Sequence, residues 1–251
     1  MADGAAEILG ANRAAANADA FIAADAALRA ASPDFRPPPL QIRYPRSSKM
    51  QLSTRVIGGV SKRAFDIVVA GSALVALSPV LLGVWALVRI DSPGPGLFRQ
   101  RRGGFEGRPF RILKFRTMKT CESRAITQAK QADDRTTLLG RILRKYSIDE
   151  LPQLINVLKG DMSIIGPRPH ALAHDRQFYG VDRRYAFRHR ARPGITGLAQ
   201  VSGSRGNTDT TDKIVQRLEH DLNYVSNWSW KMDIGIFFRT LRVLWSDRSA
   251  F

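Results

Sequence analysis

The sequence contains one cysteine, Cys121, among its 251 residues, so no disulfide can form within the chain. Histidine is almost as scarce, with His170, His174, His189 and His220. These are too few ligands for a closed Cys and His zinc site. His170 and His174 are spaced as neighbours on a helix, but no glutamate stands between them in the H-E-x-x-H manner. We therefore expect solvated or core histidines rather than metal ligands.

Acidic residues are also few. The chain has 39 Lys and Arg against 22 Asp and Glu, which gives a formal net charge of +17. Such an excess indicates polyanionic partners, which could be nucleic acid, an anionic membrane surface or phosphorylated substrates. No helix-turn-helix, zinc-finger or RNP pattern is visible, so we expect no nucleic acid. A basic membrane-surface or nucleic-acid-binding protein without catalysis is the alternative.

A run of 22 residues, Ile67–Val88, lacks any charge. At ~1.5 Å per residue a helix of this length can cross a hydrocarbon layer of ~30 Å. Ser78-Pro79 interrupts the run at its midpoint, where the proline removes an amide donor and its ring clashes with the carbonyl of Val75. The hydroxyl of Ser78 can satisfy the backbone group that the proline frees.

Basic residues flank this run on both sides, which by the positive-inside rule places both ends in the cytoplasm. We therefore predict a membrane hairpin over residues 61–92, in which a helix, a break at Ser78 and Pro79, and a second helix enter and leave the same leaflet. A kinked full span and a soluble buried helix are the alternatives. The first residues show no signal-peptide pattern, and residues 1–60, rich in Ala and Pro, form an appendage that we expect to be largely disordered.

Two candidate strands, Leu97–Gln100 and Pro109–Phe115, follow the run and are separated by the turn sequence Gly103–Gly107. Alternation along the second strand and just beyond it places Lys114 and Arg116 on one face. These cations could bind either a lipid phosphate or a substrate phosphate. We further expect helices over residues 138–146, 171–188 and 212–225, and an amphipathic helix over residues 228–245 that either lies at a membrane interface or packs in the core.

The adjacent carboxylates Asp149 and Glu150 fall where helical periodicity begins. Ser147 and Glu150 have the S-x-x-E spacing of a capping box, so the pair could simply be helix-terminal charges. A second feature favours chemistry: Arg168 lies between two prolines, on a stiff backbone that suits a guanidinium aimed at a phosphate. A later glycine-rich segment carries Arg192 and Arg205, and its glycines would let the backbone approach a ligand closely.

Together these segments resemble the bacterial sugar transferase family, the monotopic phosphoglycosyl transferases, from about Ser61 onward. The matching motifs are KRAFD (Lys62–Asp66), the Ser78-Pro79 break, LKFRTM (Leu113–Met118), SIDELPQLINVLKGDMSIIGPRP (Ser147–Pro169), RPGITGLAQVSG (Arg192–Gly203) and DLNYV (Asp221–Val225). The enzymes that start exopolysaccharide with galactose 1-phosphate look most similar. In this family an arginine commonly follows the glycine of the V-x-G segment directly, whereas here Ser204 precedes Arg205.

The resemblance implies transfer of a hexose 1-phosphate, galactose or glucose, from a UDP-sugar to undecaprenyl phosphate with release of UMP. Asp149 would be the nucleophile, Glu150 would assist it, and Mg²⁺ near Asp149 would neutralise the diphosphate. The phosphate-binding candidates are Lys114, Arg116, Arg168, Arg192 and Arg205.

The predicted fold is α+β and mostly helical. The membrane hairpin of residues 61–92 would be followed by a catalytic domain over residues 93–251 with an interfacial C-terminal helix. The resemblance places this domain on the cytoplasmic face of the bacterial inner membrane, against anionic phospholipid, with no further spans. It leaves a homodimer open.

Overall fold

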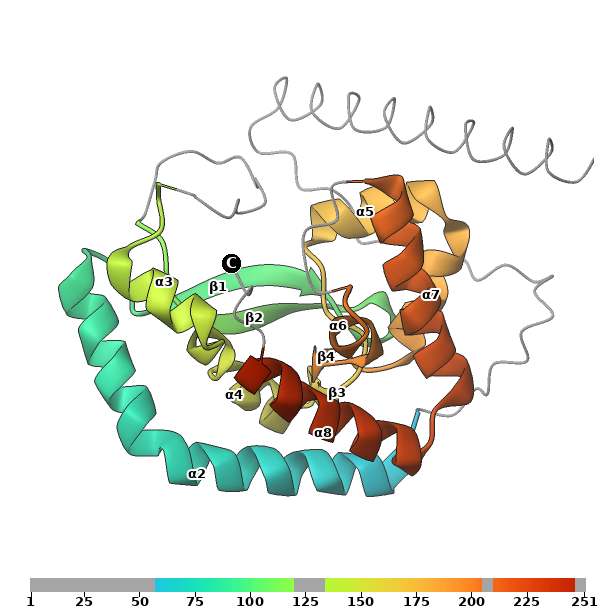
Figure 1. Ribbon diagram of the computed structural model, residues 1–251, viewed down its shortest axis with the longest axis horizontal. Coiled ribbons are helices and arrows are strands. Elements are labelled where there is room, and N and C mark those ends of the chain that lie inside the picture. The colour runs from blue at the N-terminus through green and yellow to red at the C-terminus, as the bar shows by residue number, and fades with distance from the viewer. Residues whose placement is uncertain (1–56, 120–133, 205–209, 247–251) are drawn as a thin grey trace, which may run out of the picture.

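The computed structural model describes residues 57–119, 134–204 and 210–246. The appendage expected at residues 1–60 lies almost wholly outside this range, and so does Arg205. The described chain is mostly helical with two small sheets, which agrees with the predicted class (Figure 1). Its elements in order are α2 (Gly59–Asp91), β1 (Leu97–Gly103), η1 (Phe105–Gly107), β2 (Pro109–Phe115), α3 (Leu138–Lys145), η2 (Ile148–Glu150), α4 (Gln153–Lys159), β3 (Ser163–Ile165), α5 (Leu172–Val181), η3 (Arg183–Arg190), β4 (Gly194–Thr196), α6 (Leu198–Val201), α7 (Thr211–Asn227) and α8 (Trp230–Ser246).

The uncharged run lies inside α2, a single helix that is long and apolar enough to cross a membrane by length and composition. The helix continues through Pro79 but is bent, and in Figure 1 its second part turns upward from its first. Ser78 Oγ donates to the carbonyl of Val75 at 2.8 Å. This is the carbonyl that the missing amide of Pro79 would have bonded, so the expected side-chain substitution is confirmed. The expected break between two helices is instead a bend within one helix.

The first turns of α2 are fastened to the rest of the protein by a buried ion pair. Lys62 Nζ donates to Asp233 Oδ2 of α8 at 2.6 Å, and both side chains are almost fully buried. Tyr224 and Trp228 also donate to the carboxylate of Asp233, at 2.8 and 3.0 Å. The carboxylate therefore has a partner on each oxygen, as a buried charge requires.

Two more residues of the same motif bond elsewhere in the domain. Arg63 donates to the carbonyls of Val157 and Leu158, where α4 leaves carbonyls without helical partners. Asp66 Oδ1 accepts from the hydroxyl of Ser163 and from the amide of Ile164, each at 2.9 Å. The three charged residues at the base of α2, Lys62, Arg63 and Asp66, therefore bond to α8, α4 and β3.

The predicted hairpin is confirmed, with β1 and β2 antiparallel and Leu97 opposite Phe115. A parallel pair that the sequence did not reveal joins β3 to β4. Here Gly194 approaches the chain itself and not a ligand, since a Cβ on it would lie 2.1 Å from the amide nitrogen of Gly166. A Cβ on Gly197 would be equally close to the carbonyl oxygen of Gly166. These glycines are therefore required by the pairing, which corrects the ligand-approach interpretation.

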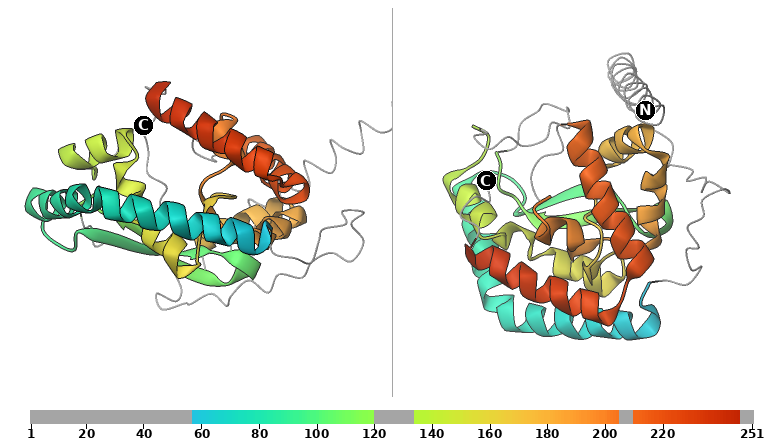
Figure 2. Two further views of the ribbon diagram at one scale, coloured as in Figure 1. Left: turned by 90° about the horizontal axis from the view of Figure 1, so that it is seen from below. Right: turned by 45° about the vertical axis from the view of Figure 1, so that its right-hand side comes forward.

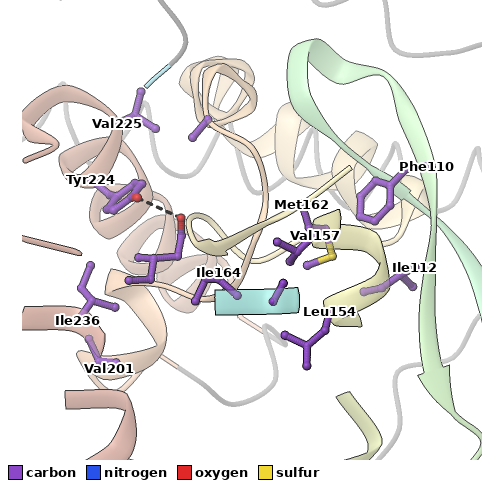
Figure 3. Close-up of a cluster of buried hydrophobic side chains, with 13 residues drawn as sticks. Phe110, Ile112, Leu154, Val157, Met162, Ile164, Val201, Tyr224, Val225 and Ile236 are labelled. Atoms are coloured by element: carbon purple, nitrogen blue, oxygen red, sulfur yellow. Dashed lines mark hydrogen bonds between the residues drawn. The ribbon is translucent and has the colours of Figure 1, made fainter. Parts of the chain in front are cut away.

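The main hydrophobic core lies between α2, α4, the two small sheets and the last two helices. Figure 3 shows its residues, among them Ile112, Leu154, Met162 and Ile236. The hydroxyl of Tyr224 donates to the carbonyl of Ile165 within this cluster, so the single polar tip among these side chains is satisfied (Figure 3). The core places α4 and β3, the two elements that flank the acidic pair and Arg168, on a rigid base.

The remaining expected helices are found with small differences. Helix α3 and helix α7 match the predicted ranges closely, while residues 171–188 form α5 and then the 3-10 segment η3. A second cluster packs α7 against α5 and η3 (Figure 2). Helix α8 packs one face in the core, where Asp233 and Ile236 are buried, and leaves Ile234, Phe238 and Leu241 at least half exposed. The expected membrane interface stays a prediction.

Replacing Lys62 by methionine tests the ion pair at the base of α2. The change leaves the carboxylate of Asp233 buried without its cation, so we expect the free energy of unfolding to fall by about 3 kcal/mol. For a domain of this size that is a drop of about 6–12 °C in Tm. Lys231→Met is the matched control, since Lys231 is exposed on the same helix as Asp233. Equal thermal shifts of the two variants in detergent would contradict the proposed anchor.

Candidate active site

The acidic pair lies in a short 3-10 turn, η2, and not in the first turn of α4. Ser147 adopts the left-handed conformation with φ 55 and makes no capping bond to the helix, so the expected capping box is wrong. Pro152 is the residue before α4, where its missing amide costs no helical bond. At the far end Gly160 closes α4 in the left-handed conformation, with φ 88. Asp149 and Glu150 therefore lie on a turn, and neither of them caps helix α4.

Glu150 is held by two cations. Both guanidinium nitrogens of Arg168 donate to its two carboxylate oxygens, and Lys114 Nζ donates to Oε1 at 2.7 Å. The bidentate geometry is the one that a guanidinium adopts with a carboxylate or a phosphate. The structure thus brings together Asp149, Glu150, Lys114 and Arg168 from β2, η2 and the segment after β3.

The two neighbouring carboxyls have opposite electrostatic environments. Burial, with the negative charge of Glu150 adding to it, raises the pKa of Asp149 to about 6. Burial also acts to raise the pKa of Glu150, but Arg168 and Lys114 outweigh it and hold that pKa well below its usual range. Asp149 is 9 % exposed. Among the described residues its carboxylate forms no ion pair, whereas that of Glu150 pairs with Lys114 and Arg168. Asp149 is the carboxylate available for chemistry.

The backbone that follows the Cα of Arg168 is fixed by two further arginines. Arg188 donates to the carbonyl of Arg168 and pairs with Asp221 of α7 at 2.9 Å. Arg102 donates to the carbonyl of Pro169 at 3.2 Å. Burial, and then the charge of Arg168, lower the pKa of Arg102 to about 10. Asp221 therefore acts on the site through Arg188, which sequence reasoning missed because no motif marks an arginine that binds a backbone carbonyl.

His170 belongs to a hydrogen-bonded network that also includes Arg188. His170 Nδ1 lies 2.6 Å from the hydroxyl of Tyr185, which itself donates to Asp175 Oδ1 at 2.6 Å. Burial and the nearby arginines lower the pKa of His170 well below its usual value, so this imidazole is neutral. Within the described ranges no group of three His, Cys, Asp or Glu residues is arranged to hold a metal ion. The pair His170 and His174 is part of the packing, as expected.

The other three phosphate-binding candidates are Arg116, Arg192 and Arg205. The first two bond to groups other than the acidic pair. The guanidinium of Arg116 donates to the carbonyls of Val88, Ser92 and Pro93, where it closes the end of α2. Arg116 follows the last residue of β2, and its side chain bonds to the end of α2, whereas Lys114 bonds to Glu150. Arg192 donates to the carbonyl of Gly160 at 3.1 Å. Arg205 lies outside the described residues.

The sequence comparisons agree on one family. Residues 57–247 match the model of the family described as bacterial sugar transferase. The chain is 48% identical over 198 residues to the UDP-glucose:undecaprenyl-phosphate glucose-1-phosphate transferase of Caulobacter vibrioides, covering 78% of this chain and 74% of that protein. The Escherichia coli protein of the same description is 49% identical over 191 residues, covering 76% of this chain and 41% of that protein.

A third relative is the exopolysaccharide production protein PSS of Rhizobium leguminosarum, 46% identical over 187 residues, covering 72% of this chain and 94% of that protein. The match extends over every element that builds the site, from the base of α2 to α8. The chain is a transferase, and it belongs to the bacterial sugar transferase family.

The environment of Asp149 predicts a measurable titration. In protein labelled with ¹³C at the aspartate carboxyls, the signal that Asp149→Asn removes should titrate at about pH 6. Lys114→Met removes a positive charge that stabilises the ionised form, so the midpoint should rise by about one unit. Arg111→Met, an exposed change on the same strand, is the control and should leave the midpoint in place. A midpoint near 4 in the wild type would contradict this electrostatic description.

Proposed function

We propose that the protein transfers glucose 1-phosphate from UDP-glucose to undecaprenyl phosphate, as the first membrane step of exopolysaccharide or other glycan assembly. The sugar and the acceptor follow the printed functions of the Caulobacter and Escherichia coli relatives. The observation that carries the chemistry is the pairing of Asp149, free to react, with Glu150, held by Arg168 and Lys114. Galactose, the sugar transferred by the enzymes that the sequence motifs resemble most, is the alternative hexose.

In the first half-reaction a carboxylate oxygen of Asp149 attacks the phosphorus that carries the sugar. The bond from this phosphorus to the bridging oxygen breaks, and UMP leaves with that oxygen and the bonding electron pair. The product is a sugar phosphate joined to Asp149 as an acyl phosphate, a known type of covalent intermediate for carboxylates. A pKa of about 6 leaves Asp149 mainly ionised at neutral pH and more basic than an ordinary aspartate, which supports this role.

In the second half-reaction an oxygen of the lipid phosphate attacks the same phosphorus, and the carboxylate of Asp149 leaves. The lipid phosphate, with a second pKa of about 6, is already largely a dianion at neutral pH and needs no strong base. Glu150 is a poor base because its pKa is low. We propose that Glu150 positions Arg168 and Lys114. When the substrate binds, these two side chains can bond to its phosphates in place of Glu150.

A magnesium ion would fit this site if a protein carboxylate and the substrate phosphates bound it together. Mg²⁺ prefers oxygen ligands and is often bound by one or two carboxylates together with substrate phosphates. The oxygens of Glu150 are taken up by Arg168 and Lys114, so Asp149 is the carboxylate that would hold the ion. When bound, Mg²⁺ would neutralise charge on the diphosphate.

Asp149→Asn tests the covalent mechanism. The amide is not a nucleophile, so transfer from UDP-glucose to undecaprenyl phosphate in nanodiscs should fall by at least about 10³-fold. Exchange of labelled UMP into UDP-glucose, measured without lipid, should vanish as well. Glu150→Gln is the comparison: it removes the charge that positions Arg168 and Lys114 but leaves the nucleophile, so exchange should be weakened and still measurable. Normal turnover by Asp149→Asn would exclude the acyl phosphate.

We also propose that α2 enters and leaves the cytoplasmic leaflet of the inner membrane, which keeps the catalytic domain in the cytoplasm. The bend at Pro79, with Ser78 bonded to Val75, supports this topology. So does the attachment of both ends of α2 to one domain: Lys62 is bonded to α8, and the carbonyls at its far end are bonded to Arg116. A straight span would carry those two ends to opposite faces of the bilayer.

Cysteine labelling tests this topology. In a variant with Cys121 replaced by serine, single cysteines are placed at Ser61, just before the anchor, and at exposed Arg108, beyond the end of α2. An impermeant maleimide added to spheroplasts should label neither position, and opening the membrane should make both reactive. Labelling of one position alone in intact spheroplasts would establish a full span instead.

A further inference from the structure

A cavity of about 190 Å³ lies beside the acidic pair, between η2, the start of α4, the turn from β4 into α6, and α8. It shares Glu150 with the candidate active site but has been given no role so far. Its lining residues are Tyr146, Ser147, Glu150, Leu151, Leu154, Ile195, Thr196, Gln200, Val201, Thr240 and Val243.

The lining is chemically suited to an apolar occupant. Five of the eleven lining residues are aliphatic, namely Leu151, Leu154, Ile195, Val201 and Val243. The hydroxyls of Thr196 and Thr240 bond each other at 2.7 Å, and the Gln200 amide donates to the carbonyl of Ile195 at 3.1 Å. Gln200 Oε1 is buried and has no hydrogen-bond partner among the described residues. Beyond this one oxygen, a sugar would bury several hydroxyl groups here against few free partners, at a cost of about 1–3 kcal/mol for each unsatisfied group.

The cavity also connects two different surfaces. Glu150, with its bound cations Lys114 and Arg168, contributes to one wall. Helix α8 contributes Thr240 and Val243 to the lining, and its outer side exposes Phe238 and Leu241. An elongated molecule with a charged head and an apolar tail could place its head at the cations and leave along the apolar side of α8.

We propose that this cavity binds the isoprene unit next to the phosphate of the polyprenyl phosphate acceptor. The inference rests on the proposed function, which supplies the acceptor, and adds where its chain lies. The size agrees, since an apolar protein cavity of about 150 Å³ holds a benzene molecule and an isoprene unit has one carbon fewer. The phosphate then lies at the end of the cavity where Asp149 carries the sugar phosphate.

Filling the cavity tests the proposal. Val243→Phe adds bulk from α8 into the cavity, so the KM for undecaprenyl phosphate in the transfer assay should rise at least about tenfold. Exchange of labelled UMP into UDP-glucose, which needs no lipid, should keep its rate and its KM for the donor. Val60→Phe is the matched control, because it makes the same change at an exposed position in the first turn of α2 that does not line the cavity, and it should leave both assays unchanged.

The outcomes separate the competing occupants. An unchanged KM for the lipid, or a loss of donor exchange equal to the loss of transfer in a variant that melts like the wild type, would overturn the proposal. The second of these results would place the donor in the cavity. Val243→Met adds less bulk and should raise the KM for the lipid by a smaller factor, which guards against misfolding of the phenylalanine variant. Absence of exchange in the wild type would refute the acyl phosphate alone, since the KM for the lipid still reports on the cavity.

Discussion

The structure depends on the buried contacts at the base of α2. Lys62, Arg63 and Asp66 bind three separate elements, so a helix with a mostly exposed apolar surface is fixed rigidly to the domain that carries the site. Buried ion pairs are costly to form and are a poor source of net stability. Their benefit here is orientation: they set the angle at which the apolar helix leaves the domain, and hence the height of η2 above a membrane in which that helix lies.

Part of the strong positive charge is used inside the protein. Counted in the sequence, the excess of Lys and Arg predicts a surface for polyanions. In the structure several of these cations are consumed internally: Lys62 neutralises a buried carboxylate, Arg116 closes the end of α2, and Arg188 supports the backbone of Arg168. The count of Lys and Arg therefore overstates the number of cations that are free to bind a polyanion at the surface.

Local patterns predicted the elements whose cause is local. Helices α3 and α7 and the β1–β2 hairpin were predicted because periodicity and turn residues act over a few positions. The parallel pairing of β3 with β4 was missed, since each strand has three residues and its partner is distant in sequence. The capping box failed because Ser147 adopts a left-handed conformation that its spacing does not encode. In the same way, residue type indicated Asp149 and Arg168, whereas the carbonyl-binding Arg188 carries no motif.

The adjacent carboxyls show how one turn can produce two different groups from similar side chains. A bidentate arginine and a lysine keep Glu150 charged, and that charge, together with burial, makes ionisation of Asp149 harder. The cost of holding Glu150 as an anion is met by Arg168 and Lys114, the cations that an incoming phosphate would also attract. In the proposed mechanism, a bound diphosphate draws these cations toward itself, and the electrostatic balance at Asp149 shifts when its carboxylate attacks. Binding of the donor and activation of the nucleophile are thereby coupled through Glu150.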